Sequence, residues 1–261
     1  IEQVQMSEIK IKIENLYKIF GPRAREYTDK VKGGIDKDEL LAKYNHVLGL
    51  DDINLDIKKQ SIQVVMGLSG SGKSTLIRHI NRLIEPTEGT VLVDGEDITK
   101  LNKADLLEFR RNKTGMVFQR FALFPHHNIL DNVQFGLSIK NLDKSESKDK
   151  AMYWIEKVGL TGFENKFPNQ LSGGMQQRVG LARALAIDPD ILLMDEAFSA
   201  LDPLIRTDMQ DQLLDLQKNL KKTIIFITHD LDEALKLGDR IAILNGGKLV
   251  QDGNAEEILL N

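Results

Sequence analysis

The chain has 261 residues, enough for one large α/β domain or two small ones, and its 41% hydrophobic and 28% charged residues are ordinary for a globular protein. The net charge of −4 argues against a general nucleic-acid-binding protein, because such proteins usually carry a basic surplus. The lack of cysteine excludes disulfides and thiolate metal sites, and no apolar run approaches the ~20 residues that cross a bilayer. Residues 1–5 show no basic region before an apolar stretch, so we expect no signal peptide and a soluble, cytoplasmic protein.

Periodicity and turn residues predict the elements of the first half of the chain. In order, they are a half-buried strand over 9–13, a charged surface insertion over about 21–50 with a helix at 37–44, a strand over 62–66, a helix over 74–83, a strand pair over 89–98 that turns at Asp94-Gly95, and a short strand over 116–118.

The second half continues as helices alternating with apolar strands. The predicted elements are a helix over 141–160 that starts at Ser145 or Ser147 and stops at Gly159, a helix over 175–187, strands over 191–194 and 223–228, and a hairpin over 240–250 around Asn245-Gly246-Gly247. The continuous apolar strands are typical of a parallel sheet that is covered on both faces.

Polar or glycine-rich segments follow the carboxyl ends of several predicted strands. They are the glycine loop after Met66, Gln119 after Phe118, Asp195 and Glu196 after Met194, and His229 after Thr228. In open α/β sheets, ligands bind outside the carboxyl ends of the strands. We therefore expect these groups at one edge of one sheet.

Residues 67–75 read Gly-Leu-Ser-Gly-Ser-Gly-Lys-Ser-Thr, which fills every fixed position of a phosphate-binding loop. The alternative, a glycine-rich turn without a ligand, leaves that full match after an apolar strand unexplained. Lys73 is expected at the β- and γ-phosphates, and the Ser74 hydroxyl at Mg²⁺. The predicted nucleotide-binding residues of the loop are Gly67, Leu68, Ser69, Gly70, Ser71, Gly72, Lys73, Ser74 and Thr75.

Asp195 ends an apolar strand, where a carboxylate is costly to bury without a cation, and Mg²⁺ is the natural partner. Glu196 follows immediately and points to the opposite face if the chain stays extended. We therefore predict Glu196 as the base that polarises the attacking water, rather than as a member of a surface salt bridge.

Ser172-Gly173-Gly174 precedes the helix over 175–187, where Ser172 serves as a helix cap. A capped helix start with bare glycine amides is also an anion site. With the phosphate loop, the chain then has two anion sites. They hold either two anions or one anion shared between two chains, and the residues alone leave both possibilities open.

The ordered motifs resemble those of the ATP-binding cassette (ABC) ATPases, and the resemblance covers the chain from about Ile9. The landmarks are the phosphate loop, Gln119, Leu-Ser-Gly-Gly at 171–174, Ile-Leu-Leu-Met-Asp-Glu at 191–196, Ser-Ala-Leu-Asp at 199–202 and Thr-His-Asp at 228–230. The resemblance implies an α/β P-loop NTPase of ABC type, with a parallel-sheet core, an antiparallel β subdomain and a helical signature subdomain. It also implies one ATPase domain over 1–261, with Q-loop and signature regions over about 100–185.

The resemblance further implies a head-to-tail homodimer that binds ATP and Mg²⁺. Ser172, Gly173 and Gly174 of one subunit would contact the γ-phosphate held by the other, and Asp202 would cross the interface. Gln119 would reach Mg²⁺ and the attacking water, which makes Ser74, Gln119 and Asp195 the predicted metal site. His229 would be the switch residue at the γ-phosphate, and Phe20 would stack on adenine.

Longer stretches resemble the ATPase subunits of glycine betaine/proline betaine importers. They are Leu-Ser-Gly-Gly-Met-Gln-Gln-Arg-Val-Gly-Leu-Ala-Arg-Ala-Leu at 171–185, residues 81–87, residues 195–206 and the insertion before Leu50. The commonest family signature has Gln where this chain has Met175, and a thioether cannot donate a hydrogen bond. The subfamily often carries a pair of CBS domains, which this chain does not contain, so the sequence gives no basis for ionic-strength sensing.

This resemblance implies a subunit that powers import of a quaternary ammonium osmolyte of the glycine betaine, proline betaine or choline class. Its partners would be an integral membrane permease, contacted by the aromatic segment 121–127, and an extracytoplasmic substrate-binding protein, with no nucleic acid. It would lie peripherally on the cytoplasmic side of the bacterial inner membrane. The alternatives are an ABC ATPase for another small polar solute, a soluble non-transport ABC ATPase and a small-molecule kinase. The kinase alternative leaves residues 172–178 and His229 unexplained.

Overall fold

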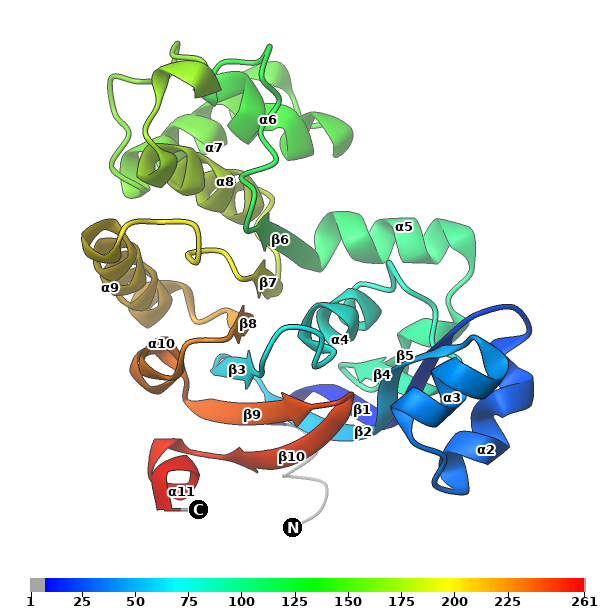
Figure 1. Ribbon diagram of the computed structural model, residues 1–261. Coiled ribbons are helices and arrows are strands. Elements are labelled where there is room, and N and C mark those ends of the chain that lie inside the picture. The colour runs from blue at the N-terminus through cyan, green and yellow to red at the C-terminus, as the bar shows by residue number, and fades with distance from the viewer. Residues whose placement is uncertain (1–7, 261) are drawn as a thin grey trace. The chain divides into compact units, whose positions relative to one another are not determined.

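The computed structural model describes residues 8–260, so residues 1–5, where we expect no signal peptide, lie outside the described residues (Figure 1). The chain divides into two compact units. The first unit runs to Leu106 and resumes at Ile227, and the second is Leu107–Phe226. The chain therefore passes between the units within helix α5 (Lys103–Asn112) and within strand β8 (Thr223–Thr228). None of the described helices is both long and apolar enough to span a membrane.

An antiparallel sheet forms one part of the first unit, as predicted. Its strands lie in the order β2 (Val47–Lys58), β1 (Ile9–Phe20), β4 (Glu88–Val93) and β5 (Glu96–Asp97). In β1, Ile13 pairs with Leu55 on one side and with Val91 on the other. All three side chains are buried, because alternate residues of each strand face the core.

The other strands of the first unit lie in the order β10 (Lys248–Gly253), β9 (Arg240–Asn245) and β3 (Ile62–Met66). β9 runs parallel to β3, with Val64 paired to Ile241, and forms the predicted hairpin with β10. The associated helices are α4 (Lys73–Ile80), the 3₁₀ turn η2 (Ile98–Lys100), α10 (Leu231–Leu237) and α11 (Ala255–Leu260).

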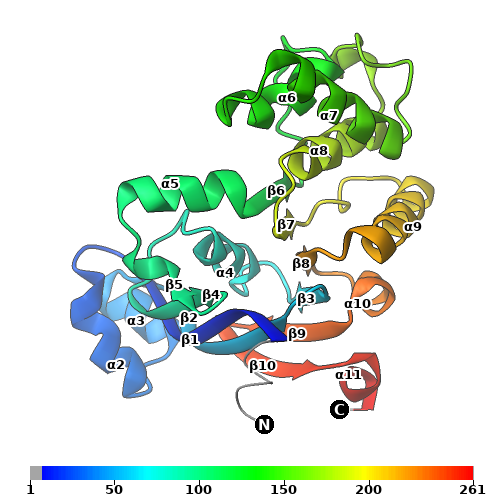
Figure 2. The same cartoon turned by 180° about the vertical axis from the view of Figure 1, so that it is seen from behind.

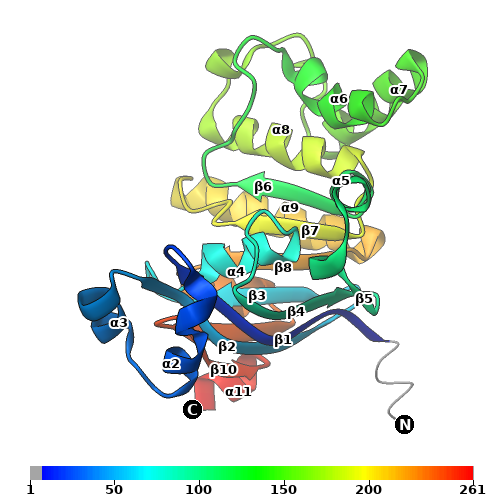
Figure 3. The ribbon, with the colours of Figure 1, turned by 90° about the vertical axis from the view of Figure 1, so that its right-hand side faces the viewer.

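The charged insertion folds into short helices with a small core of their own. They are η1 (Ala24–Tyr27), α2 (Thr28–Lys32) and α3 (Lys37–Tyr44), and the last confirms the helix predicted at 37–44. Both α2 and α3 lie beside the sheet that contains β1 and β2 (Figure 3). The buried residues that hold them there are Tyr17, Ile19, Val31, Leu40 and Leu48.

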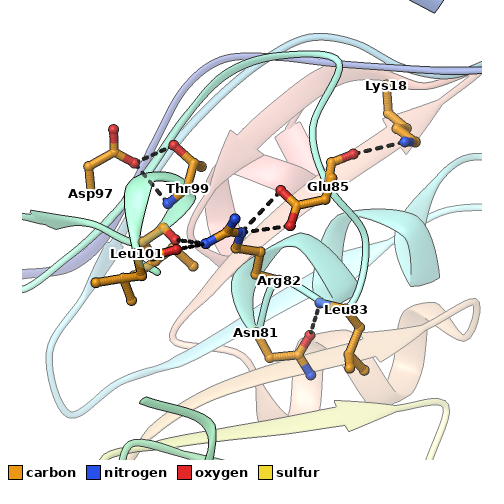
Figure 4. Close-up of polar contacts among 9 residues, drawn as sticks. Lys18, Asn81, Arg82, Leu83, Glu85, Asp97, Thr99 and Leu101 are labelled. Atoms are coloured by element: carbon orange, nitrogen blue, oxygen red, sulfur yellow. Dashed lines mark hydrogen bonds and ion pairs between the residues drawn. The ribbon is translucent and has the colours of Figure 1, made fainter. Parts of the chain in front are cut away.

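A polar cluster joins the end of α4 to the antiparallel sheet of the first unit (Figure 4). The guanidinium of Arg82 donates from Nη1 to the carbonyl oxygens of Ile98 and Leu101, at 3.1 and 2.6 Å. Its Nε donates to the Glu85 carboxylate at 2.8 Å, and Lys18 of β1 donates to the Glu85 carbonyl at 2.8 Å. The helix that follows the glycine loop is thereby tied to the strand that ends in Phe20.

The second unit contains β6 (Thr114–Phe118), β7 (Ile191–Asp195) and the first residues of β8, in the order β8-β7-β6, with β6 and β7 parallel. Every residue of β7 is buried, as expected for a strand covered on both faces. Helices α6 (Ile129–Ile139), α7 (Lys144–Lys157) and α8 (Gly173–Ala186) pack together (Figure 2). The remaining elements are η3 (Pro168–Gln170) and α9 (Pro203–Leu220).

The predicted start of α7 was wrong by a few residues. The cap is Asp143, whose carboxylate accepts from the Ser145 amide at 3.0 Å, and neither Ser145 nor Ser147 caps the helix. Aspartate is as strong a cap as serine, and its carboxylate gains from the partial positive charge of the helix start. The predicted stop at Gly159 is confirmed by a left-handed φ of 76° just after the helix.

His79 in α4 gives the protein a built-in sensitivity to acid. The ring is buried, its Nδ1 lies 2.7 Å from the Thr75 carbonyl oxygen, and its Nε2 is buried without a hydrogen-bond partner. Burial lowers the pKa of His79 from 6.5 to about 4. Between these two values the unfolded chain binds the proton and the folded chain does not, so the free energy of unfolding falls as the pH falls.

We predict that the chain loses about 2 kcal/mol of stability through His79 between pH 7.5 and pH 5. Urea unfolding at the two pH values measures the total loss, and His79→Leu isolates the contribution of the histidine because carboxylates titrate in both proteins. The variant should lose less stability on acidification than the wild type by about that amount. An equal loss in both proteins would contradict a neutral, buried His79.

Candidate functional site

The glycine loop joins β3 to α4 and wraps around the ammonium group of its own lysine. Lys73 is buried, and its Nζ donates to the carbonyl oxygens of Gly67 and Leu68 at 2.6 and 3.0 Å. Gly70 and Gly72 have φ values of 77° and 103°, which side chains rarely tolerate. These backbone turns form a nest, a concave arrangement of amides that suits a phosphate group.

Two neighbouring segments of the first unit support the loop. The Gly247 amide in the β9–β10 turn donates to the Ser71 carbonyl at 2.9 Å, and the Gly247 carbonyl accepts from the Asp51 amide at 2.8 Å. A Cβ on Gly72 would lie 2.8 Å from the Gly49 carbonyl oxygen of β2, so the backbones touch there. The Ser71 hydroxyl is buried without a hydrogen-bond partner, an unmet polar group that a ligand oxygen can satisfy.

Phe20 ends β1 next to the same backbone. A Cβ on Gly49 would lie 2.7 Å from the Phe20 ring, and Gly49 also contacts Gly72 of the loop. Phe20 is 39% exposed, and the Lys18 ammonium lies 5.0 Å from the centre of its ring. An exposed ring beside a phosphate loop has the chemistry to stack on a base.

His229 lies in the first unit with the loop and Phe20, immediately after β8. The Asp230 carboxylate caps α10 by accepting from the Glu233 amide at 3.1 Å. The Thr228 hydroxyl donates to the Glu233 carboxylate at 2.6 Å and accepts from the Asp230 amide at 3.0 Å. These bonds fix the backbone on both sides of His229, whose own side chain is exposed.

The second unit holds Gln119, Asp195 and Glu196. Phe118 and Asp195 pair in the parallel register of β6 and β7, so Gln119 and Glu196 follow at the same edge of the unit. Asp195 is only 8% exposed, which makes it a buried carboxylate at a strand end. For these three of the residues expected at one sheet edge, the register of β6 and β7 agrees with the prediction.

The expectation that Glu196 continues an extended strand is wrong. Its φ is 48°, in the left-handed region that glutamate rarely adopts, so the chain turns sharply after Asp195. The Ser199 amide and hydroxyl donate to the Glu196 carbonyl at 3.2 and 2.9 Å and close this turn. Backbone strain of this kind is typical of functional positions, where it fixes the direction of a side chain.

Arg206 braces the segment that carries Asp202. From the first turn of α9, its guanidinium donates to the carbonyl oxygens of Phe198, Ser199 and Leu201, each at 3.2 Å. Asp202 occupies the cap position before Pro203 at the start of α9. No sequence motif pointed to Arg206 as the residue that shapes this turn.

The predicted Ser172 cap is confirmed, and α8 begins at Gly173, two residues before the predicted start. The Ser172 hydroxyl accepts from the Met175 amide at 3.2 Å, and Gly173 and Gly174 form the first turn. A Cβ on Gly174 would lie 2.5 Å from Ile205 of α9, so glycine is required there for close packing.

Arg183 links α8, the signature helix that begins within the Leu-Ser-Gly-Gly motif, to the segment after Gln119. The sequence did not reveal this role. Its guanidinium donates to the Ala122 and Phe121 carbonyl oxygens at 2.8 and 3.3 Å, and burial lowers its pKa. The Phe121 ring lies 3.6 Å from where a Cβ of Gly173 would be. The backbone after Gln119 therefore lies against the later turns of α8, near Gly180 and Arg183, while the Phe121 ring reaches its first turn.

Asn132 organises the aromatic segment 121–127 from within α6. Its amide nitrogen donates to the Phe124, His127 and Asn128 carbonyl oxygens at 3.2, 3.0 and 3.0 Å, and its oxygen accepts from the Phe124 amide at 2.9 Å. Asn132 is fully buried, so these bonds satisfy its whole amide group. A single asparagine inside a helix pattern gave no sequence signal for this role.

The residues predicted to hold Mg²⁺ suit an ion shared with phosphate oxygens. Among residues 8–260, no group of three or more histidine, cysteine, aspartate or glutamate side chains forms a metal cage. Mg²⁺ usually keeps several waters and is bound through one or two carboxylates together with substrate phosphates. Ser74, Gln119 and Asp195 supply a hydroxyl, an amide and a carboxylate of that kind.

Comparison of this chain with known proteins shows which family it resembles. The model of the ABC transporter family matches residues 50–199. The glycine betaine transport ATP-binding protein OpuAA of Bacillus subtilis is 56% identical over 258 residues, which cover 99% of this chain and 62% of OpuAA. The glycine betaine/proline betaine transport system ATP-binding protein ProV of Escherichia coli is 55% identical over 253 residues, which cover 97% of this chain and 63% of ProV. The chain thus spans less than two thirds of the length of these two relatives.

A solved structure has the same fold. The dimeric structure of MJ0796, a bacterial ABC transporter cassette, matches with a TM-score of 0.79 and 34% identity, over 94% of this chain and 98% of that one. The P-loop ABC fold expected from the sequence is confirmed by this similarity.

The left-handed backbone at Glu196 predicts an unusual order of stability. Glycine adopts this conformation freely, whereas a residue with a Cβ loses roughly 1–2 kcal/mol, so Glu196→Gly should be about 1 kcal/mol more stable than Glu196→Ala. Both variants lack the carboxylate, so their difference in urea unfolding isolates the backbone.

Asp211, in the middle of α9 and exposed, is the matched control. There Asp211→Gly should be about 1 kcal/mol less stable than Asp211→Ala, the usual order in a helix. The same order at both positions would show that residue 196 is not left-handed in solution.

Proposed function

Because the chain belongs to the ABC transporter family, we propose that it is the ATP-hydrolysing subunit that powers import of a quaternary ammonium osmolyte through a membrane permease. The proposed ATP hydrolysis is supported by the phosphate loop around the buried Lys73, which is followed in the chain by the strained turn at Glu196. The substrate class, glycine betaine, proline betaine or choline, is supported by 56% identity to OpuAA and 55% to ProV, whose names state glycine betaine transport.

In this proposal each site residue has one task in ATP hydrolysis. The amides of residues 67–75 and the Lys73 ammonium bind the phosphates, and Phe20 stacks on adenine. Glu196 takes a proton from the attacking water, Gln119 orients that water, and His229 contacts the γ-phosphate. When bound, Mg²⁺ would be held by Ser74, Gln119 and Asp195 and would neutralise charge on the phosphates.

We further propose that the single ATPase domain works as a head-to-tail homodimer. The support is the second anion site of the chain, the Ser172-capped start of α8 with its two glycine amides. Ser172, Gly173 and Gly174 of one copy would complete the phosphate site of the other, and Asp202 would lie at the interface. The similar MJ0796 cassette is described as dimeric.

The permease would dock on the aromatic segment 121–127, at the cytoplasmic face of the bacterial inner membrane. The Phe124 ring lies 4.6 Å from the Phe135 ring of α6, and Phe135 is 39% exposed. A groove of about 630 Å³ is lined by residues that include His127, Asp131 and Phe135. Exposed aromatic side chains next to a groove are typical of a surface that a partner covers. An extracytoplasmic binding protein would select the substrate.

Replacing Glu196 tests the hydrolytic mechanism. Glu196→Gln keeps the shape of the side chain but removes its basicity, so ATP turnover should fall by ~10²-fold or more while ATP binding persists. Glu256→Gln, an exposed glutamate in α11, is the control and should leave turnover unchanged. Full activity of Glu196→Gln would refute the assignment of the base.

The same variant also tests the proposed homodimer. In the Glu196→Gln background, gel filtration should show an ATP-dependent dimer that Ser172→Arg abolishes.

A reconstituted importer tests the substrate class. The chain, its permease and its binding protein are placed in proteoliposomes, and ATP hydrolysis is measured with glycine betaine, proline betaine or choline outside and with a sugar, a metal ion and an ordinary amino acid as controls. We expect stimulation by the quaternary amines only, since an aromatic cage in the binding protein can select them through cation–π attraction. Stimulation by a control solute alone would favour the alternative, an importer of another small polar solute.

A further inference from the structure

The charged insertion is the part of the first unit to which the proposed function assigns no task, yet both of its ends adjoin the phosphate loop. It begins directly after Phe20 and leads into β2, where Gly49 contacts both the Phe20 ring and Gly72. Asp51, two residues later, donates through its amide to Gly247, which in turn holds Ser71. The insertion therefore begins and ends at segments that contact the phosphate loop or the turn that supports it.

Helix α3 has a defined position within the insertion. Leu40 is fully buried in the small core against β1 and β2, and the Asp36 carboxylate caps the helix by accepting from the Glu39 amide at 2.7 Å. The ammonium groups of Lys30 and Lys32 lie 5.1 and 5.5 Å from the ring centres of Tyr44 and Tyr17. Contacts on several sides fix the helix, so the direction of its first residue is set by the fold.

The first residue of α3 is Lys37, and its side chain reaches the phosphate loop. Its Nζ donates to the Gly70 carbonyl oxygen at 3.4 Å. A Cβ on Gly70 would meet no atom within 4 Å, so the loop is open on that side. The ammonium of Lys73 is enclosed by carbonyl oxygens on the inside of the same loop.

We propose that Lys37 is a second phosphate-binding lysine, supplied by the insertion, that contacts the phosphate chain of the bound nucleoside triphosphate. A lysine ammonium has three donors, so one can stay on the Gly70 carbonyl while another bonds to a phosphate oxygen. The lysine stem is flexible enough to reach an anion at the rim of the loop. This inference rests on the proposed function, because it requires the loop to bind a nucleotide.

Nucleotide binding to Lys37→Gln tests the proposal. Dissociation constants for ATP are measured by calorimetry at low ionic strength, and those for inorganic triphosphate by competition against a fluorescent ATP analogue. A lost ammonium–phosphate contact on a partly exposed lysine should weaken both ligands by a similar factor, about three- to tenfold. Because salt screens exposed charges, the factor should shrink as the salt concentration rises.

Two matched variants separate the phosphate contact from other effects. Lys37→Arg keeps the charge and should retain most of the affinity. Lys43→Gln removes a charge from the far end of the same helix, where the lysine pairs with Glu39, and should leave both affinities unchanged. Thermal unfolding of all the variants confirms that the insertion stays folded.

The outcomes distinguish this inference from the proposed function. Unchanged binding by Lys37→Gln would overturn the role of Lys37. Weaker binding of ATP without weaker binding of triphosphate would overturn it as well, because Lys37 would then affect the adenosine part of ATP and not its phosphates. An equal effect of Lys37→Gln and Lys43→Gln would also overturn it, since the loss of one positive charge anywhere on α3 would then explain the weaker binding. A wild-type chain that binds neither ligand would instead refute the proposed function itself.

Discussion

The enclosure of the Lys73 ammonium is the interaction on which the first unit depends. A buried cation is costly unless polar groups surround it, and the carbonyl oxygens of Gly67 and Leu68 meet that need. Between these carbonyls and Lys73, the loop takes left-handed conformations at Gly70 and Gly72, which turn backbone amides toward a ligand. One stretch of backbone therefore both surrounds the Lys73 ammonium and forms the site for an anion.

The rest of the first unit supports that path from outside. The turn at Gly247 holds Ser71, β2 passes against Gly72, and the Arg82 cluster ties α4 to the antiparallel sheet. The insertion extends the same support, because its core is shared with β1 and β2. A surface segment rich in charge therefore supports the phosphate loop from outside without being part of it.

In the second unit, a left-handed turn and two partly buried arginines hold the site segments, whereas the first unit uses a buried lysine. Glu196 is held in a left-handed turn that Ser199 closes, and Arg206 binds three carbonyl oxygens of the segment that follows. Arg183 holds the backbone after Gln119 on the signature helix in a similar way. Guanidinium groups suit this task because their several donors can satisfy carbonyl groups that no strand or helix pairs.

The sequence by itself determined the elements and the chemistry that local signals encode. The strands at 62–66 and 223–228 and the helix at 37–44 were predicted with their observed bounds, because apolar runs, glycines and a helix cap act over a few residues. The motif residues were identified in the same way. Only the tertiary structure placed Lys37 on Gly70, 33 residues away, and Arg183 on Ala122, 61 residues away. It alone showed the turn at Glu196. Such contacts depend on packing and chain closure between distant segments, which no local pattern of residues encodes.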